Sequence, residues 1–226
     1  MSQKNYWTRR DGPPDDELAS LMEVAACALL AEDQRLAAGL RGTPLTAASG
    51  APGWTAAQQG HTAIARVGHG LSYWVYETTL VYVIWRAWIE SGRVAAWDWT
   101  LRELAGRERI PHGDGGLRYD LVLFRGDEPH AVFEAKWWNL DTDAVRLALD
   151  EDAAKLRGSR FFAGARKFLI VFWFEQKTQS DEMQRDVATF CAAAGLTFRG
   201  SAKFDANFLA RTQRVGGSFV LGVLEA

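Results

Sequence analysis

The chain has 226 residues, of which 48% are hydrophobic and 24% charged, and its formal net charge is −2. This length allows one good-sized domain, or one domain with an elaborated end, and the composition is that of an ordinary globular protein. The slightly acidic charge excludes a protein whose overall basicity drives nucleic-acid binding, so any such binding must rest on local positive charge.

Two features bear on the cellular location of the chain. Cys27 and Cys191 are the only cysteines, they lie far apart, and they have no metal-ligand spacing, which favours a reducing compartment. The N-terminal stretch has no apolar segment, so we expect no signal peptide. Residues 71–89 form the one long apolar run, but Glu77 and Arg86 interrupt it, which indicates a buried helix. We therefore expect a cytoplasmic protein that contacts no membrane.

Helical patterns dominate the first 90 residues. Residues 1–13 are expected to form a frayed tail, and residues 17–40 an Ala- and Leu-rich helix. Residues 42–60 are rich in Gly, Ala, Ser, Thr and Pro, which is typical of a linker. A second helical region begins near Thr62 and continues as the apolar helix 71–90.

From residue 94 the pattern changes to the two-residue period of β-strands, interrupted by a loop over residues 105–116. The expected strands cover residues 94–101, 118–124, 131–138, 167–174, 196–199 and 218–224, and the expected helices cover residues 143–156 and 181–194. The continuous apolar run at 167–174 is typical of a central strand that is covered on both faces. This order of elements predicts an α/β layered domain.

Two acidic residues and a lysine lie on neighbouring predicted strands. If Phe124 pairs with His130 across the intervening turn, Asp120 lies opposite Glu134, and Lys136 shares their face. Opposed carboxylates repel one another, and a divalent cation between them turns this repulsion into ligation. The lysine can then orient or deprotonate a water molecule and stabilise a pentavalent phosphate. A slip of the register by one residue would separate the two acids.

These residues carry a family resemblance. The chain reads R-Y-D-L-V-L-F and then, on an apolar strand, E-A-K, which resembles the PD-(D/E)XK nuclease superfamily, although Tyr119 stands where the motif has proline. The resemblance covers roughly residues 71–175, where the predicted helix–strand–strand–strand–helix–strand order is similar to that of the superfamily's core. It implies an α/β restriction-endonuclease-like core, with a central mixed β-sheet flanked by helices. The nuclease-like domain would occupy residues 61–226, after a helical extension and linker at 1–60.

The resemblance also implies chemical roles. Asp120 and Glu134 would bind Mg²⁺ or Mn²⁺, and Lys136 would assist the attacking water. The implied activity is hydrolysis of phosphodiester bonds in nucleic acid, with double-stranded DNA as the expected partner, in defence or DNA processing. A homodimer is left open. The alternatives are an inactive nuclease-fold protein that acts as a binding scaffold, and an interaction domain in which the motif is coincidental.

Many members of the superfamily carry a further acid on the helix before the sheet, and Glu77 is the best match. Val81, Ile84 and Trp88 share its helical face, so this carboxylate points toward packed apolar surface. Such a placement is costly unless the group is paired or ligates something. We therefore expect Glu77 to be a third catalytic and metal-binding acid, whereas Glu90 lies at a solvated helix end.

Other polar residues near the motif have ordinary explanations. Asp98 is expected to face solvent from an outer strand. Asp152 and Lys155 are spaced as an i,i+3 ion pair on the helix after the motif, and we favour that over a role in the site. His112 and His130 are expected to be solvated loop residues near the site.

A local basic segment supplies the positive charge that the whole chain lacks. It contains five cations and no acid, which we expect to bind a phosphate backbone: Lys155, Arg157, Arg160, Arg166 and Lys167. A second cluster comprises Arg199, Lys203, Arg211 and Arg214. The alternative for both is a charged, solvated loop.

Overall fold

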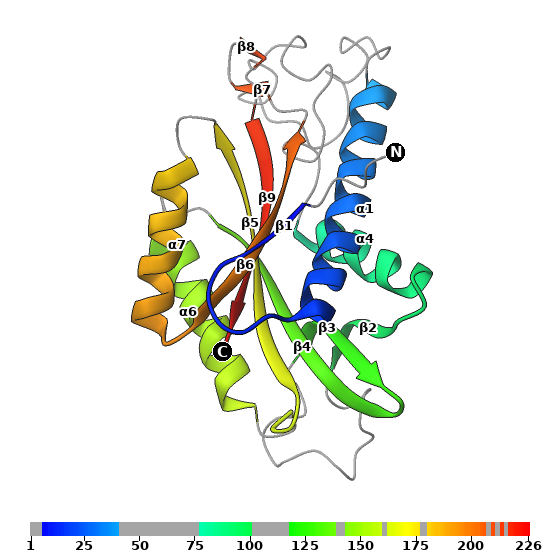
Figure 1. Ribbon diagram of the computed structural model, residues 1–226, viewed down its shortest axis with the longest axis vertical. Coiled ribbons are helices and arrows are strands. Elements are labelled where there is room, and N and C mark those ends of the chain that lie inside the picture. The colour runs from blue at the N-terminus through cyan, green and yellow to red at the C-terminus, as the bar shows by residue number, and fades with distance from the viewer. Residues whose placement is uncertain are drawn as a thin grey trace.

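A seven-stranded mixed sheet forms the centre of the computed structural model, with helices on both of its faces (Figure 1). The strand order is β1-β6-β9-β5-β4-β3-β2, and β4 and β5 run parallel to one another. The structure describes residues 6–40, 77–100, 118–138, 143–159, 162–176, 180–206, 209–210, 213–214 and 217–226. The predicted α/β class is thus confirmed.

Apart from β1, β7 and β8, which were not predicted, the observed elements follow the predicted order. The helices are α1 (Asp16–Leu40), α4 (Glu77–Glu90), α6 (Asp143–Gly158) and α7 (Ser180–Ala194). The strands of the sheet are β1 (Trp7–Arg9), β2 (Val94–Thr100), β3 (Arg118–Arg125), β4 (Glu128–Trp137), β5 (Arg166–Gln176), β6 (Thr197–Ala206) and β9 (Gly217–Glu225). A separate small hairpin joins β7 (Leu209–Ala210) to β8 (Gln213–Arg214).

Two of the expected segments differ in the structure. The frayed tail at 1–13 is wrong for its middle part, because β1 pairs with β6. The short strand expected at 196–199 is wrong in length, because β6 continues for ten residues along β9. The expected linker at 42–60, the helical region from Thr62 to residue 76 and the loop at 105–116 lie outside the described residues.

The sheet separates two hydrophobic cores. Helices α1 and α4 cover one face, and α6 and α7 cover the other (Figure 1). Along β4, Phe133 and Ala135 enter the core under α1 and α4, while Val132 enters the opposite core. Because strand side chains alternate, Glu134 and Lys136 lie on the α6 side of the sheet. The face of the sheet on which the acids stand is therefore set by this alternation.

Helix α1 belongs to the main core rather than to an appended unit. Its apolar face is fully buried against α4 and the sheet, through residues that include Leu21, Met22 and Leu29. The indole Nε1 of Trp88 in α4 donates a hydrogen bond of 3.0 Å to the carbonyl of Leu21. The described part of the expected extension at 1–60 thus shares its core with the sheet. In the described residues, no helix is long and apolar enough to cross a membrane.

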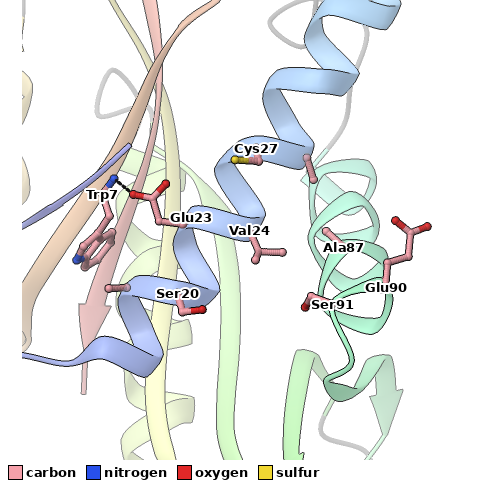
Figure 2. A pocket seen from close by; sticks show the side chains of 10 residues that line it. Trp7, Ser20, Glu23, Val24, Cys27, Ala87, Glu90 and Ser91 are labelled. Atoms are coloured by element: carbon pink, nitrogen blue, oxygen red, sulfur yellow. Dashed lines mark hydrogen bonds between the residues drawn. The ribbon is translucent and has the colours of Figure 1, made fainter. Parts of the chain in front are cut away.

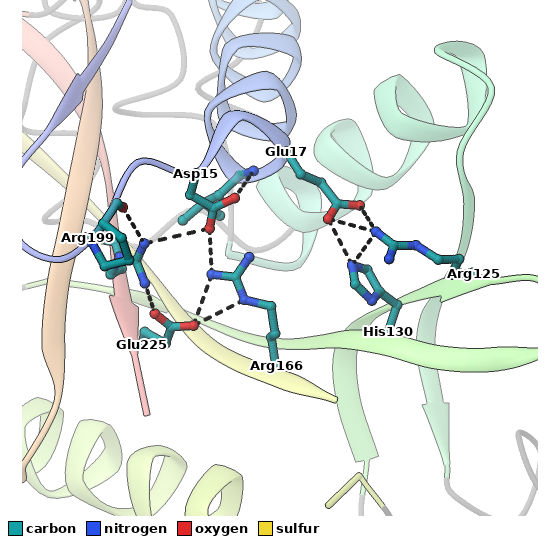
Figure 3. Close-up of polar contacts among 9 residues, drawn as sticks. Asp15, Glu17, Arg125, His130, Arg166, Arg199 and Glu225 are labelled. Atoms are coloured by element: carbon teal, nitrogen blue, oxygen red, sulfur yellow. Dashed lines mark hydrogen bonds and ion pairs between the residues drawn. The ribbon is translucent and has the colours of Figure 1, made fainter. Parts of the chain in front are cut away.

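A network of ion pairs fixes the start of α1 to the sheet (Figure 3). Asp15 accepts a hydrogen bond of 3.0 Å from the backbone of Leu18, as a helix N-cap does. The other oxygen of Asp15 lies 2.5 Å from Arg166 and 3.7 Å from Arg199. Both arginines also bind Glu225 at the end of β9. Segments from both ends of the chain are joined here.

A second, smaller cluster lies beside this network. Glu17 binds Arg125 at 3.0 Å and the Nε2 atom of His130 at 2.9 Å (Figure 3). His130 is thus a strand residue with an acidic partner on α1, and the expectation of a solvated loop histidine is wrong.

Candidate active site

The β3–β4 ladder has the register that the site requires, although the turn differs from expectation. Phe124 pairs with Pro129, so the predicted pairing with His130 is wrong, because a β-bulge interrupts the ladder just before Phe124. Beyond the bulge, Leu121 pairs with Phe133. This is the same register that pairing of Phe124 with His130 would have produced.

The next residues along the two strands are Asp120 and Glu134. Continuing the ladder by one step places them opposite one another on the α6 side of the sheet. The backbone amide of Ala135 donates a hydrogen bond of 2.7 Å to Asp120 Oδ2, which holds this carboxylate against β4. The structure therefore brings the two predicted acids together.

Both carboxylates are disfavoured as anions in this position. Burial raises the pKa of Glu134 to about 8, and the nearby charge of Asp120 adds to this effect against the opposing influence of Lys155. Burial also raises the pKa of Asp120 to about 6, despite the hydrogen bond from Ala135. Ionising both acids of such a pair at neutral pH costs free energy. A nearby cation would offset this cost.

Helix α6 supplies two further charged groups. Lys155 Nζ lies 2.6 Å from Glu134 Oε1, and Asp152 Oδ2 lies 3.5 Å from Lys136 Nζ. The favoured i,i+3 pair between Asp152 and Lys155 is thus not the arrangement found, because both side chains reach across to β4. The sequence signal for these two contacts is the i,i+3 spacing of Asp152 and Lys155 on the helix after the motif strand. The same spacing also predicts a local ion pair, so the sequence does not distinguish the two arrangements.

Glu77 approaches the same strand from α4. Its Oε1 lies 3.3 Å from Lys136 Nζ, and its Oε2 accepts a hydrogen bond of 2.9 Å from the backbone amide of Trp137. As predicted, the residues on its helical face are buried: Val81, Ile84 and Trp88. Glu77 is therefore paired with Lys136 and with the backbone of β4.

The charge of the cluster suits a divalent cation. Four carboxylates (Glu77, Asp120, Glu134 and Asp152) face two ammonium groups (Lys136 and Lys155). When all six are ionised, two negative charges remain uncompensated. Within the described part of the chain, no three His, Cys, Asp or Glu side chains converge closely enough to hold a metal ion by themselves. Mg²⁺ is commonly held by one or two carboxylates plus water and phosphate oxygens, which an Asp–Glu pair satisfies.

Other candidates lie away from this cluster. Asp98 is exposed on β2 and pairs with Arg118 at 3.0 Å, and Glu90 is exposed and pairs with Arg86 at 2.7 Å. The expectation of solvated acids at these two positions is confirmed. His112 lies outside the described residues.

The basic segment is largely engaged in internal contacts. Lys155 binds Glu134, and Arg166 belongs to the network at the start of α1. Arg157 donates to the carbonyl of Ala194, and Lys167 donates to the carbonyl of Ser159 at 3.1 Å. In the second cluster, Arg199 binds Glu225 and Lys203 binds Glu175. The side chains of Arg160, Arg211 and Arg214 lie outside the described residues. Phosphate binding by the basic segment remains a prediction.

A surface hollow of about 800 Å³ lies between β1, α1 and α4 (Figure 2). Its lining includes Trp7, Glu23, Val24 and Cys27, and Glu23 accepts a hydrogen bond of 2.5 Å from the backbone of Trp7. The hollow is lined by none of the six charged residues of the acidic cluster, so it is separate from the candidate site.

No family model matches the chain, and the curated proteins and solved structures that were searched contain no match either. The function must therefore be argued from the geometry of the site.

Proposed function

We propose that this protein is a metal-dependent nuclease that hydrolyses phosphodiester bonds in DNA, built on a restriction-endonuclease-like core. One observation carries the proposal: the β3–β4 ladder, continued by one step, sets Asp120 opposite the buried Glu134, whose pKa the charge of Asp120 raises. Lys136 is next along the same face of β4. Buried opposed carboxylates destabilise a fold without a compensating role. Binding a cation supplies such a role.

Asp120 and Glu134 are the residues that would hold Mg²⁺ or Mn²⁺. When bound, the metal ion would polarise a phosphate oxygen and lower the pKa of a water molecule. The raised pKa values of both acids support this assignment, because a bound cation would compensate the charge of the two ionised carboxylates.

Lys136 has the properties of a positively charged phosphate ligand. Burial lowers its pKa, but the charges of Glu77 and Asp152 outweigh this effect and raise the pKa above its ordinary value. At neutral pH it is therefore an ammonium ion, which cannot take a proton from water. We infer that Lys136 stabilises charge on the phosphate in the transition state, while Glu77 and Asp152 position it.

The order of elements supports the fold part of the proposal. Helix α4 precedes the antiparallel strands β2, β3 and β4, and α6 then crosses to β5, which runs parallel to β4. This is the helix–strand–strand–strand–helix–strand order on which the family resemblance rests.

The decisive test combines Mn²⁺ binding with DNA cleavage. In Asp120→Asn and Glu134→Gln, we expect calorimetric Mn²⁺ binding to disappear, and cleavage of plasmid DNA to fall by on the order of 100-fold or more, as when a key electrostatic group is removed. Asp98→Asn is the matched control, because it neutralises an exposed acid on the neighbouring strand, and it should behave as the parent.

Two outcomes would contradict the proposal. Unchanged Mn²⁺ binding in both site variants would remove the metal assignment. A parent protein that binds DNA but neither binds Mn²⁺ nor cleaves would instead establish the inactive scaffold.

A further inference from the structure

Lys155 occupies a position that a metal ion would contest. Its Nζ atom lies 2.6 Å from Glu134 Oε1, and it also lies over the ring of Tyr119, 4.9 Å from the centroid. The side chain of Glu134 is 5% exposed and that of Lys155 is 23% exposed. The buried carboxylate is therefore paired with a side chain that is itself partly exposed, so an incoming ligand can reach part of Lys155.

Two cations cannot share the same carboxylate oxygen at low cost. Mg²⁺ approaches its oxygen ligands to about 2.0–2.1 Å. The ammonium group of Lys155 already stands 2.6 Å from the same carboxylate oxygen. A metal ion at Glu134 Oε1 would repel Lys155 in a weakly screened interior. Lys136 lacks this conflict, because it contacts Glu77 and Asp152 instead.

We propose that Lys155 couples phosphate binding to metal binding: it contacts Glu134 in the metal-free site and moves to a substrate phosphate when a metal ion takes the carboxylate. This inference rests on the proposed nuclease function. Its consequence is that metal and DNA bind cooperatively, because the phosphate supplies a new partner for the ammonium group that the metal displaces. Such coupling is reciprocal, so each ligand raises the affinity for the other by the same factor.

The first measurement uses Mn²⁺ alone, in calorimetric titrations without DNA. Lys155→Met removes the competing charge, so we expect it to bind Mn²⁺ roughly tenfold more tightly than the parent, within the usual range of site-to-site couplings. Lys155→Gln provides a second variant, because an amide can still donate a hydrogen bond to Glu134 without carrying a charge. Arg146→Met is the control, because it removes an exposed cation from the same helix.

The second measurement determines the affinity for a short DNA duplex with and without Ca²⁺, by fluorescence anisotropy. In the parent, we expect Ca²⁺ to strengthen DNA binding markedly. In both Lys155 variants this enhancement should shrink, while Arg146→Met retains it. Circular dichroism confirms that each variant is folded.

The possible results separate this inference from the proposed function. Equal or weaker Mn²⁺ affinity in folded Lys155 variants would overturn the coupling role and leave the nuclease proposal standing. If neither the parent nor any variant binds Mn²⁺, both fail. Tighter Mn²⁺ binding in the Lys155 variants with undiminished enhancement by Ca²⁺ would also overturn the coupling, because Lys155 would then oppose the metal without serving the phosphate.

Discussion

Glu134 is a buried acid whose position is costly to the stability of the fold. It is 4% exposed, and the charge of Asp120 on the neighbouring strand acts on its carboxylate. Burial, followed by the charge of Asp120, raises its pKa from 4.5 to about 8. The folded protein therefore retains a proton that the unfolded chain releases. The free energy of unfolding therefore falls as the pH rises from the pKa that Glu134 has in the unfolded chain to the pKa that it has in the folded protein.

We accordingly expect the metal-free protein to lose stability as the pH rises from about 4.5 to about 8. Because one pKa unit corresponds to about 1.4 kcal/mol, the change from 4.5 to about 8 should cost up to about 5 kcal/mol of stability. Urea unfolding in the presence of a chelator, across this pH window, measures the slope. Glu134→Gln should flatten it, whereas Glu90→Gln, at an exposed glutamate, should not. An unchanged slope in Glu134→Gln would show that the carboxylate is not held protonated by the fold.

At the scale of elements, the ion-pair network connects α1, β5, β6 and β9. Arg166 bridges Asp15 and Glu225, residues that are more than 200 positions apart in the sequence. Although burial raises the pKa of Asp15, the hydrogen bond and charge of Arg166 lower it below its ordinary value. Arg166 thus has a structural role that is independent of any contact with phosphate.

Arg166→Gln should therefore lower the free energy of unfolding by about 1.5–3 kcal/mol, as expected for hydrogen bonds to charged groups in a partly buried network. Urea unfolding at neutral pH measures this loss. Arg86→Gln is the control, because its pair with Glu90 is exposed on both sides and should contribute less than about 1 kcal/mol. If Arg166→Gln is as stable as the parent but binds DNA less well, the arginine serves the substrate rather than the fold.

At the scale of the whole molecule, the N-terminal helix and the sheet share one core. The buried face of α1 packs against α4, and α4 in turn carries Glu77 to the site. Deleting side-chain volume from α1 should therefore destabilise the protein as a whole. An appended extension would unfold separately, without changing the main unfolding transition.

Leu21→Ala should lower the free energy of unfolding by about 2–5 kcal/mol, the usual cost of a buried leucine, in a single cooperative transition. Leu21 is 2% exposed, whereas Leu147 on α6 is 60% exposed, so Leu147→Ala is the matched control with little expected loss. Two separate unfolding transitions, with only the first affected by Leu21→Ala, would show that α1 is an independent unit.

The sequence alone determined the local part of this protein. Alternation along one strand was sufficient to place Glu134 and Lys136 on one face, because side-chain direction in a strand has a period of two residues. Placing Asp120 with them also required the register between the two strands. The helical period likewise identified the buried face behind Glu77. The restriction-endonuclease-like assignment, however, remains a proposal that rests on the motif and the order of elements.

The tertiary structure decided which partner each charged group takes. The docking of α6 on the sheet brings Lys155 to Glu134 and Asp152 to Lys136, in place of a local pair. The packing of α1 on the sheet likewise brings Asp15, just before the helix, to Arg166. Periodicity encodes the face on which a side chain lies, but contacts between elements depend on how those elements pack, and no short-range pattern carries that information.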